Sequence, residues 1–276
     1  MRTATRLPGS TMALCLASLA LCGAALLSGC AMPAGGARGT DPSGVVLPSE
    51  ESEARKRARV RLELASRYFD QGQTNVALEE VKLALATDPA FAEAFNLRAL
   101  VYMRLNDLAL AEESFRQAQR LSPRDPGTAH NYGWFLCQQR RYDQAVAQFA
   151  VAVENLTYTD KAKTWLAQGM CQQQAGQDVQ AEQSLLRSYE LDPANPITGY
   201  NLTQLLFKRG DLQRAQFYIR RINNSEYANA ESLWLGIKVE RSLGNRQAVE
   251  QLGTQLRNRF VQSREYMALE RQAFDE

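Results

Sequence analysis

The chain has 276 residues, of which 45% are hydrophobic and 22% charged, and its formal net charge is +2 at pH 7. This near-neutral balance gives no support to nucleic-acid binding, which leaves a basic footprint in a sequence. His130 is the single histidine, and no CxxC, HExxH, GxSxG or GxxxxGK[ST] pattern occurs. A histidine-dependent triad would have to use His130 alone, and we expect that residue to be buried or to line a groove. The sequence therefore indicates a binding protein, not an enzyme, with no cofactor and no metal site.

Residues 1–29 have the pattern of a secretory signal peptide. Arg2 and Arg6 form a basic start, residues 11–27 are almost wholly apolar, and small residues precede Cys30. This order of a basic, an apolar and a small-residue region is typical of signal peptides. The apolar run is shorter than the roughly 20 residues that a membrane-spanning helix needs. The alternative is an ordinary signal peptide in which Cys30 occurs by chance.

The four residues Leu27-Ser28-Gly29-Cys30 resemble the bacterial lipobox, whose cysteine is acylated and becomes the first residue of the mature protein. The resemblance implies lipidation of Cys30, and several acyl chains on one residue give stable anchoring. Ala31 follows, where an Asp usually signals retention in the inner membrane of Gram-negative bacteria. We therefore expect a lipid anchor in the outer membrane, on its periplasmic face.

Residues 30–53 would then be the lipidated cysteine and a flexible tether. Residues 31–53 are rich in Gly, Pro, Ala and Ser and show no period, so they cannot bury a core. A flexible chain of this length spans on the order of 25 Å. Such a tether would hold a folded domain away from the lipid surface.

Residues 54–276 repeat with a period close to 34 residues. Each repeat has a small residue, a second small residue twelve positions later, and a large apolar residue four positions after that. The three series are Ala65, Ala99, Gly133, Gly169, Thr203 and Gly236; Ala77, Ala111, Ala145, Ala181, Ala215 and Ala248; and Val81, Phe115, Phe149, Leu185, Ile219 and Leu252. The pattern resembles the tetratricopeptide repeat (TPR), a helix–turn–helix unit in which small residues allow helices A and B to cross closely.

This pattern predicts an all-α, right-handed superhelical solenoid that forms one domain. The six repeats are expected at 58–91, 92–125, 126–161, 162–195, 196–228 and 229–262. A C-terminal cap, residues 263–276, would cover the open end through Tyr266, Met267, Leu269 and Phe274, because terminal repeats need a cover. We expect the carboxylates to lie on solvated outer faces.

Resemblance to the repeat family implies that helices A line a concave groove. On that assignment an apolar set faces the groove: Leu62, Phe69, Leu100, Met103 and Trp134. An amphipathic helix can lay its apolar face into such a groove, so these residues are the predicted partner-binding site. The alternative is that some of them pack between neighbouring repeats or under the tether.

Cys137 and Cys171 are the cysteines that remain once Cys30 is acylated and the signal peptide is removed. They fall in helices A of the third and fourth repeats, which pack side by side, and the periplasm is oxidising. A disulfide between them is a candidate if their Cα atoms approach within about 7 Å. Two small buried thiols are the alternative.

Residues 131–177 resemble the third-to-fourth-repeat region of the type IV pilus biogenesis and stability lipoproteins, the pilotins of the pilus secretin. The matching residues are Asn131-Tyr132-Gly133, Phe135-Leu136-Cys137, Arg141-Tyr142 and Cys171, and residues 257–269 are similar to the family's ending. Residues 153–160 depart from the family, whose members tend to carry a proline-containing segment there.

The resemblance implies an outer-membrane lipoprotein that binds secretin subunits and promotes their outer-membrane localisation and multimer assembly for pilus biogenesis and twitching motility. Its partners would be these subunits and, through the anchor, the membrane, and the protein would be a monomer by itself. Two alternatives are a TPR lipoprotein scaffold of another envelope machine, either outer-membrane protein assembly or a cell-wall hydrolase complex, and an envelope enzyme with an unfamiliar site.

Overall fold

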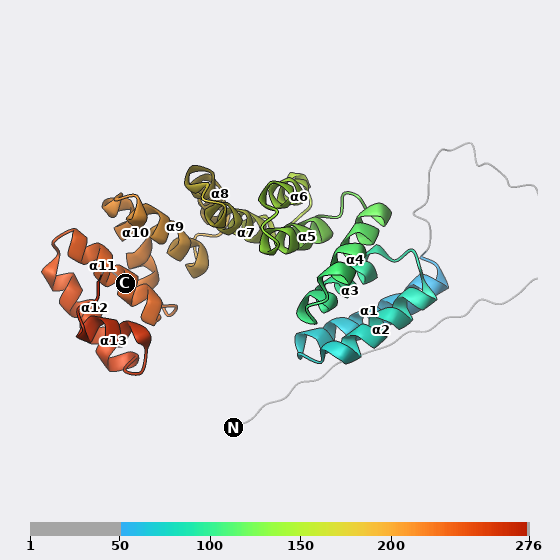
Figure 1. Ribbon diagram of the computed structural model, residues 1–276, viewed down its shortest axis with the longest axis horizontal. Coiled ribbons are helices and arrows are strands. Elements are labelled where there is room, and N and C mark those ends of the chain that lie inside the picture. The colour runs from blue at the N-terminus through green and yellow to red at the C-terminus, as the bar shows by residue number, and fades with distance from the viewer. Residues whose placement is uncertain (1–50, 275–276) are drawn as a thin grey trace, which may run out of the picture. The chain divides into compact units, whose positions relative to one another are not determined.

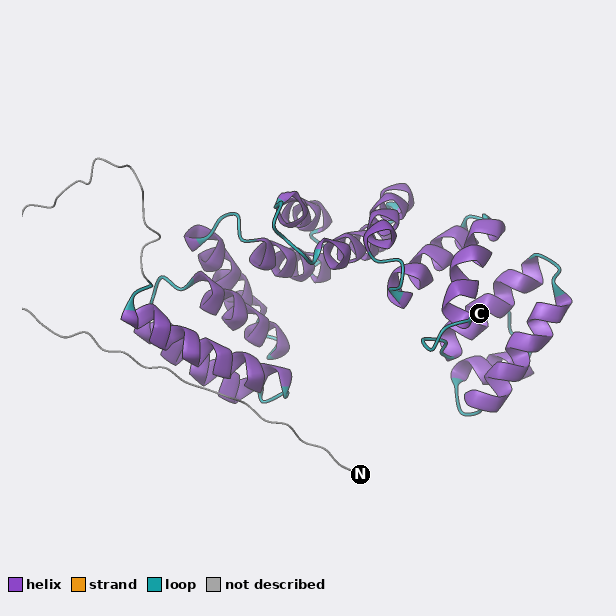
Figure 2. Cartoon of the chain, turned by 180° about the vertical axis from the view of Figure 1, so that it is seen from behind, coloured by secondary structure: helices purple, strands orange, loops and turns teal. Residues whose placement is uncertain are grey.

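The computed structural model describes residues 51–274. The predicted signal peptide, Cys30 and almost all of the predicted tether lie outside the described residues. Between residues 51 and 274 the regular structure consists of helices, with no strand (Figures 1 and 2). No helix in this range is both long enough and apolar enough to cross a membrane.

Twelve of the helices form six successive pairs, each with one helix A and one helix B (Figure 1). The pairs are α1 (Glu53–Asp70) with α2 (Thr74–Thr87), α3 (Ala92–Arg104) with α4 (Leu108–Leu121), α5 (Pro126–Gln138) with α6 (Tyr142–Glu154), α7 (Lys161–Gln174) with α8 (Asp178–Leu191), α9 (Pro196–Lys208) with α10 (Leu212–Asn223), and α11 (Ala230–Ser242) with α12 (Arg246–Arg259). The short helix α13 (Arg264–Glu270) follows α12. The prediction of an all-α TPR solenoid is confirmed.

Local capping explains where several helices begin. Helix α1 starts at Glu53, five residues before the expected first repeat, because the Ser52 hydroxyl accepts a hydrogen bond from the Arg55 backbone N–H at 3.1 Å. Asp125 caps α5 in the same way, and Pro126 then occupies the first turn, where its missing N–H costs nothing. One helix, α4, thus ends at Leu121, and the next, α5, begins only a few residues later at Pro126.

Each turn between helices A and B contains one residue with a positive φ angle. These residues are Gly72, Asn106, Arg140, Gly176, Gly210 and Gly244. A residue in the left-handed conformation ends a helix and reverses the chain direction. The same conformation at every turn keeps the pairing of A and B alike along the solenoid.

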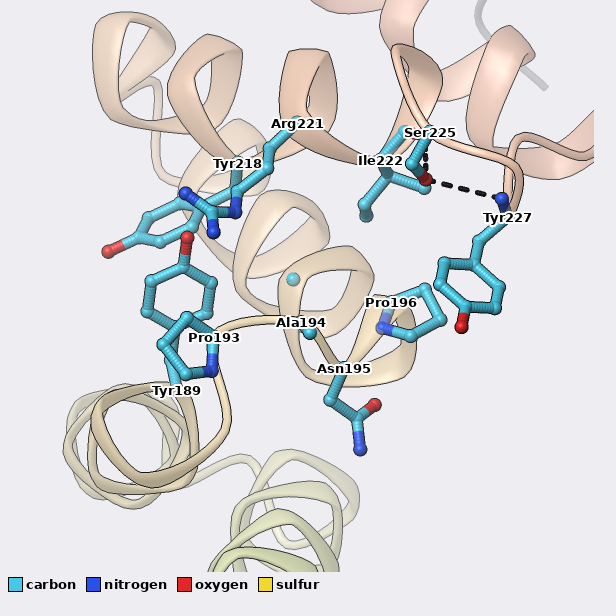
Figure 3. A pocket seen from close by; sticks show the side chains of 11 residues that line it. Tyr189, Pro193, Ala194, Asn195, Pro196, Tyr218, Arg221, Ile222, Ser225 and Tyr227 are labelled. Carbon is cyan, nitrogen blue, oxygen red and sulfur yellow. Dashed lines mark hydrogen bonds between the residues drawn. The ribbon is translucent and has the colours of Figure 1, made fainter. Parts of the chain in front are cut away.

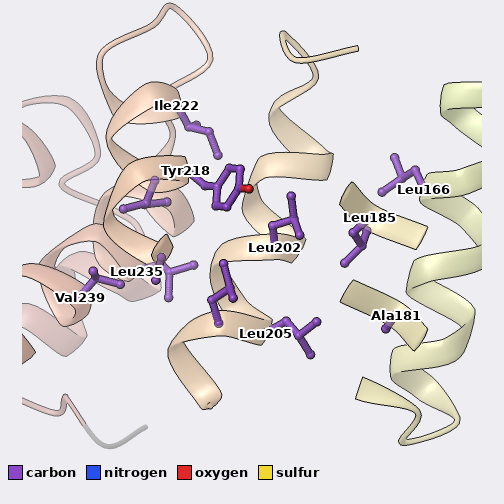
Figure 4. Packing of buried hydrophobic residues seen from close by; sticks show 12 residues of the cluster. Leu166, Ala181, Leu185, Leu202, Leu205, Tyr218, Ile222, Leu235 and Val239 are labelled. Carbon is purple, nitrogen blue, oxygen red and sulfur yellow. The ribbon is translucent and has the colours of Figure 1, made fainter. Parts of the chain in front are cut away.

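The predicted small and large residues form the core of the repeats, except for Ala248 and Leu252 of the last repeat, which are half-buried. A Cβ atom added to Gly133 would lie 2.8 Å from the Phe149 ring, and one added to Gly169 would lie 2.7 Å from Leu185. These helices can therefore approach closely only because glycine stands at the crossing. Figure 4 shows how one apolar cluster, with Leu185 and Leu202, continues from one repeat into the next.

Helices A contact one another directly along the row. Contacts join α1 with α3, α3 with α5, α5 with α7, and α9 with α11, whereas successive helices B make no comparable contact within residues 51–274. Helices A therefore share one face of the solenoid. At its C-terminal end, Leu269 of α13 packs against the last repeat and Phe274 stacks on Trp234 at 5.3 Å between ring centroids. Met267 of the expected cap is half exposed.

Candidate partner-binding site

The predicted groove residues lie on the first three helices A, and all are half-buried: Leu62, Phe69, Leu100, Met103 and Trp134. Leu62 packs against an apolar cluster of the first repeat that includes Val81 and Phe91. Leu100, Met103 and Trp134 pack against a second cluster that includes Phe115 and Phe149. Each of these four side chains thus has one part in the packing between helices and another part in solvent.

Arg104 covers Phe69. The guanidinium carbon of Arg104 lies 3.5 Å from the centroid of the Phe69 ring, and Arg104 also donates a hydrogen bond to the Phe69 backbone carbonyl. A cation above an aromatic face is attracted by the quadrupole of the ring. A partner that contacts the Phe69 ring on this side has to displace Arg104 or bind to its guanidinium group.

Polar bonds between neighbouring helices A hold the apolar side chains in place. The Asn131 side chain of α5 donates to Asn96 Oδ1 of α3 at 3.2 Å. Trp134 lies one turn after Asn131 on α5, and Leu100 lies one turn after Asn96 on α3. The amide pair therefore fixes α3 beside α5 at the point where these two apolar residues are presented.

Cys137 of α5 and Cys171 of α7 form a disulfide, and their Cα atoms are 5.7 Å apart. Both residues belong to the same buried cluster as Phe149. The bond links helices A of the third and fourth repeats, and the helix that carries Cys137, α5, also carries Trp134.

His130 is buried, and its Nδ1 lies 2.8 Å from Thr164 Oγ1. The Tyr158 hydroxyl lies 3.1 Å from the same Thr164 oxygen. Burial, with a smaller contribution from Lys163, lowers the pKa of His130 from 6.5 to about 4, against a weak opposite effect of Asp160. His130 is therefore neutral at pH 7 and joins α5 to α7 as a structural residue. No group of His, Cys, Asp and Glu side chains between residues 51 and 274 could hold a metal ion.

The expectation that the carboxylates lie on solvated faces is wrong for Glu182 and Glu240, both of which are buried. Glu240 of α11 accepts hydrogen bonds from Arg220 Nε at 2.6 Å and from the Gln216 amide at 2.8 Å. Burial favours the neutral acid, but these donors outweigh it and lower the pKa of Glu240 below its usual value. The carboxylates are buried because arginines of neighbouring elements compensate their charge.

A hollow lies near the start of α9 and was not predicted from the sequence. Figure 3 shows Tyr189 and Tyr218 on one side of it and Tyr227 on the other. The rings of Tyr189 and Tyr218 meet edge to face at 5.0 Å, and the cavity has a volume of about 200 Å³. Its residues come from two helices B, the start of helix α9 and two loops, so they share no period that could reveal them in the sequence.

Comparison with known proteins agrees with this architecture of paired helices. Residues 62–126 match the tetratricopeptide repeat family. The fold and the apolar face of helices A thus define a TPR protein, a class that binds protein partners.

Similar proteins assign the chain to a particular family within this class. It is 28% identical to the type IV pilus assembly protein PilF of Pseudomonas aeruginosa over 232 residues, which are 84% of this chain and 92% of PilF. The crystal structure of PilW, a widely conserved type IV pilus biogenesis factor, is 31% identical, with a TM-score of 0.70 over 78% of this chain and 98% of PilW. A structure of Pseudomonas aeruginosa PilF is 27% identical, with a TM-score of 0.71 over 80% of this chain and 100% of that one. The chain belongs to this family of TPR proteins of type IV pilus biogenesis.

Proposed function

We propose that this protein is a lipid-anchored pilotin of the outer membrane, which binds subunits of the type IV pilus secretin and promotes their localisation and multimer assembly. The observation that carries the proposal is membership of the pilus biogenesis family over nearly the whole described chain. The protein acts by binding, since a TPR solenoid offers a long surface for a partner segment.

The secretin segment binds along helices A of the first three repeats. Supporting this, Leu62, Leu100 and Trp134 keep part of their apolar surface in solvent although they are held in place by packing. An amphipathic helix of the partner can cover these parts with its own apolar residues. Full burial of a large side chain contributes roughly 1.5–3 kcal/mol, so completing the burial of a half-buried one contributes about half of that.

Substitution of Leu62 tests this location. Leu62→Lys places a charge in the proposed interface, and we expect the secretin to be lost from material that co-purifies with the detergent-solubilised full chain. Val60→Lys is the matched control, because Val60 lies on the same helix, is 66% exposed and points away from the packed face. The control variant should retain the secretin.

The unfolding temperature separates the outcomes of this test. Leu62→Lys and Phe69→Lys should unfold close to the wild-type midpoint, since both side chains already reach solvent. A collapsed midpoint would assign these residues to the core and remove the groove. If the folded Leu62→Lys and Phe69→Lys variants still retain the secretin, the partner binds elsewhere on the protein.

The anchor is tested separately at Cys30. Cys30→Ser removes the acylated sulfur, and the protein should move from the outer-membrane fraction to the soluble periplasm. Wild-type amounts of this variant in the outer-membrane fraction would contradict the assignment of a lipid anchor, and would leave the secretin-binding proposal to its own test.

A further inference from the structure

A polar groove lies in the last two repeats, away from the residues proposed to bind the secretin. Its lining comes from the B helices α10 and α12, the turn before α12, and the buried residues Gly236 and Glu240 of α11. Its volume is about 340 Å³. Six of the twelve residues that line it are asparagines or glutamines, so the groove favours hydrogen bonds over apolar burial.

The charges of this groove compensate one another. Glu240 is 1% exposed and accepts hydrogen bonds from Arg220 Nε at 2.6 Å, Arg220 Nη2 at 3.1 Å and Asn245 Nδ2 at 2.9 Å. Arg220 and Glu240 are the charged residues that line the cavity. The groove therefore offers no net charge to a ligand, and a neutral ligand suits it best.

Three glutamines form a regular row along one wall. Gln247, Gln251 and Gln255 are four residues apart on α12 and line the cavity. Four residues of α-helix rise about 6 Å. None of the three side chains makes a hydrogen bond to another described residue, and all reach solvent. Each amide is thus free to donate one hydrogen bond and accept another.

The opposite wall contains a buried acceptor without a donor. Asn223 is 7% exposed, and its Nδ2 donates to the Ser232 carbonyl oxygen at 3.0 Å. Its Oδ1 has no hydrogen-bond partner within residues 51–274. Buried polar atoms of proteins are nearly always paired, so this oxygen has a hydrogen bond to gain, but it is sealed from solvent and the Asn223 side chain has to shift before a donor from outside can reach it.

We propose that this groove binds an extended, uncharged polypeptide segment of a partner protein through the peptide backbone. In an extended strand, alternate residues repeat about every 6.4–6.8 Å, close to the spacing of the glutamine row. Each glutamine amide can then donate to a peptide carbonyl and accept from a peptide N–H, and Asn223 Oδ1 can accept from one further N–H once its side chain has shifted toward the groove. Recognition of the backbone tolerates many sequences, provided that the segment is extended and carries no charge at the groove.

Fluorescence anisotropy of the detergent-solubilised full chain tests this proposal. The probe is a labelled twelve-residue peptide of alternating threonine and serine, and a second probe carries N-methyl groups on every backbone nitrogen. We expect the first probe to bind and the second to bind at least about tenfold more weakly, because it lacks backbone donors. Equal binding of both probes, or no binding of the first up to millimolar concentration, would overturn the proposal.

Two triple variants test the location. Gln247→Ala/Gln251→Ala/Gln255→Ala should weaken the first probe at least about tenfold. The matched control Glu250→Ala/Thr254→Ala/Asn258→Ala uses the same helix and spacing at exposed positions outside the cavity, and it should bind as the wild type does. Unchanged binding by the glutamine variant, or displacement of the probe by a neutral chito-oligosaccharide and not by unlabelled peptide, would refute recognition of a peptide backbone here.

Discussion

Two joints between neighbouring repeats hold the same fold together by different chemistry. Between α5 and α7 the joint is neutral: it consists of the Cys137–Cys171 disulfide and the contact of His130 with Thr164. Between α10 and α11 the joint is ionic, because Arg220 of α10 binds the buried carboxylate of Glu240. Both lie next to cores that are built from the same repeated small and large residues.

The difference shows which part of a TPR solenoid is fixed and which part can vary. Close crossing of helices within a repeat requires residues such as Gly133 and Gly169, since an added Cβ would collide with the partner helix. Contacts between repeats have no such requirement. The neutral joint should respond to reductant and to moderate acid, and the ionic joint should respond to loss of one charged partner.

Loss of the disulfide should have the largest effect on the neutral joint. Cys137 and Cys171 are separated by 34 residues. A cross-link that closes a loop of this length lowers the entropy of the unfolded chain and stabilises the fold by about 3–4 kcal/mol. We expect Cys137→Ser/Cys171→Ser to lower the free energy of unfolding by this amount in urea titrations without reductant. Added reductant should lower the stability of the wild type and leave that of the double variant unchanged. Two titratable thiols in the unfolded, non-reduced wild type would contradict the bond.

Acid should weaken the neutral joint through His130. The pKa of His130 is about 4 in the fold and 6.5 as its ordinary value, so the unfolded chain binds a proton more readily. Its contribution is present above pH 6.5 and is lost as the pH falls from 6.5 to about 4, with a total of up to about 3 kcal/mol. His130→Asn keeps a hydrogen-bonding group and removes this titration, so its stability should change less over that interval. Parallel losses in the variant and the wild type would show that other groups are responsible.

The ionic joint should show a smaller effect. Arg220→Met leaves Glu240 with Gln216 and Asn245 as donors, and we expect a loss of about 1–2 kcal/mol in urea at pH 7, because the Arg220 side chain is itself half exposed. Arg221→Met is the control, since Arg221 is exposed and makes no ion pair within the described residues. Equal losses in the two variants would show that the ion pair adds nothing beyond the general effect of removing an arginine.

The same variant predicts a change of pH dependence. The pKa of Glu240 is lowered in the fold, so its contribution is present above about pH 4.5 and is lost as the pH falls through the lower value. Without Arg220 that pKa should rise, and the loss should begin at a higher pH. If the free energy of unfolding of the variant fell over the same acidic pH range as that of the wild type, the ion pair between Arg220 and Glu240 would be contradicted.

Periodic packing could be predicted from the sequence. Ala65, Ala99, Ala77 and Ala111 recur because close crossings admit little else, and the structure buries all of them completely. The sequence assigned the apolar residues to helices A, and the structure places them on α1, α3 and α5. Their degree of burial could not be predicted, since half-burial of Leu62 or Trp134 depends on the side chains that pack against them from other helices.

Features that combine different repeats could not be predicted. Glu240 resembles any surface carboxylate in the sequence, and its burial depends on Arg220, which lies twenty residues earlier on another helix. The cover of Phe69 by Arg104 and the hollow beside Tyr189 likewise depend on residues without a common spacing. Such contacts follow from the stacking of repeats, which a pattern within one repeat does not contain.

Deletion of the gene tests the proposed function most directly. Outer-membrane fractions of the deletion strain and of a strain complemented with the wild-type chain would be compared by immunoblotting for the type IV pilus secretin. A pilotin predicts that secretin multimers disappear from the outer membrane of the deletion strain, that secretin monomers persist in the cell, and that complementation restores the multimers. Undiminished multimers in the outer membrane of the deletion strain would contradict the account.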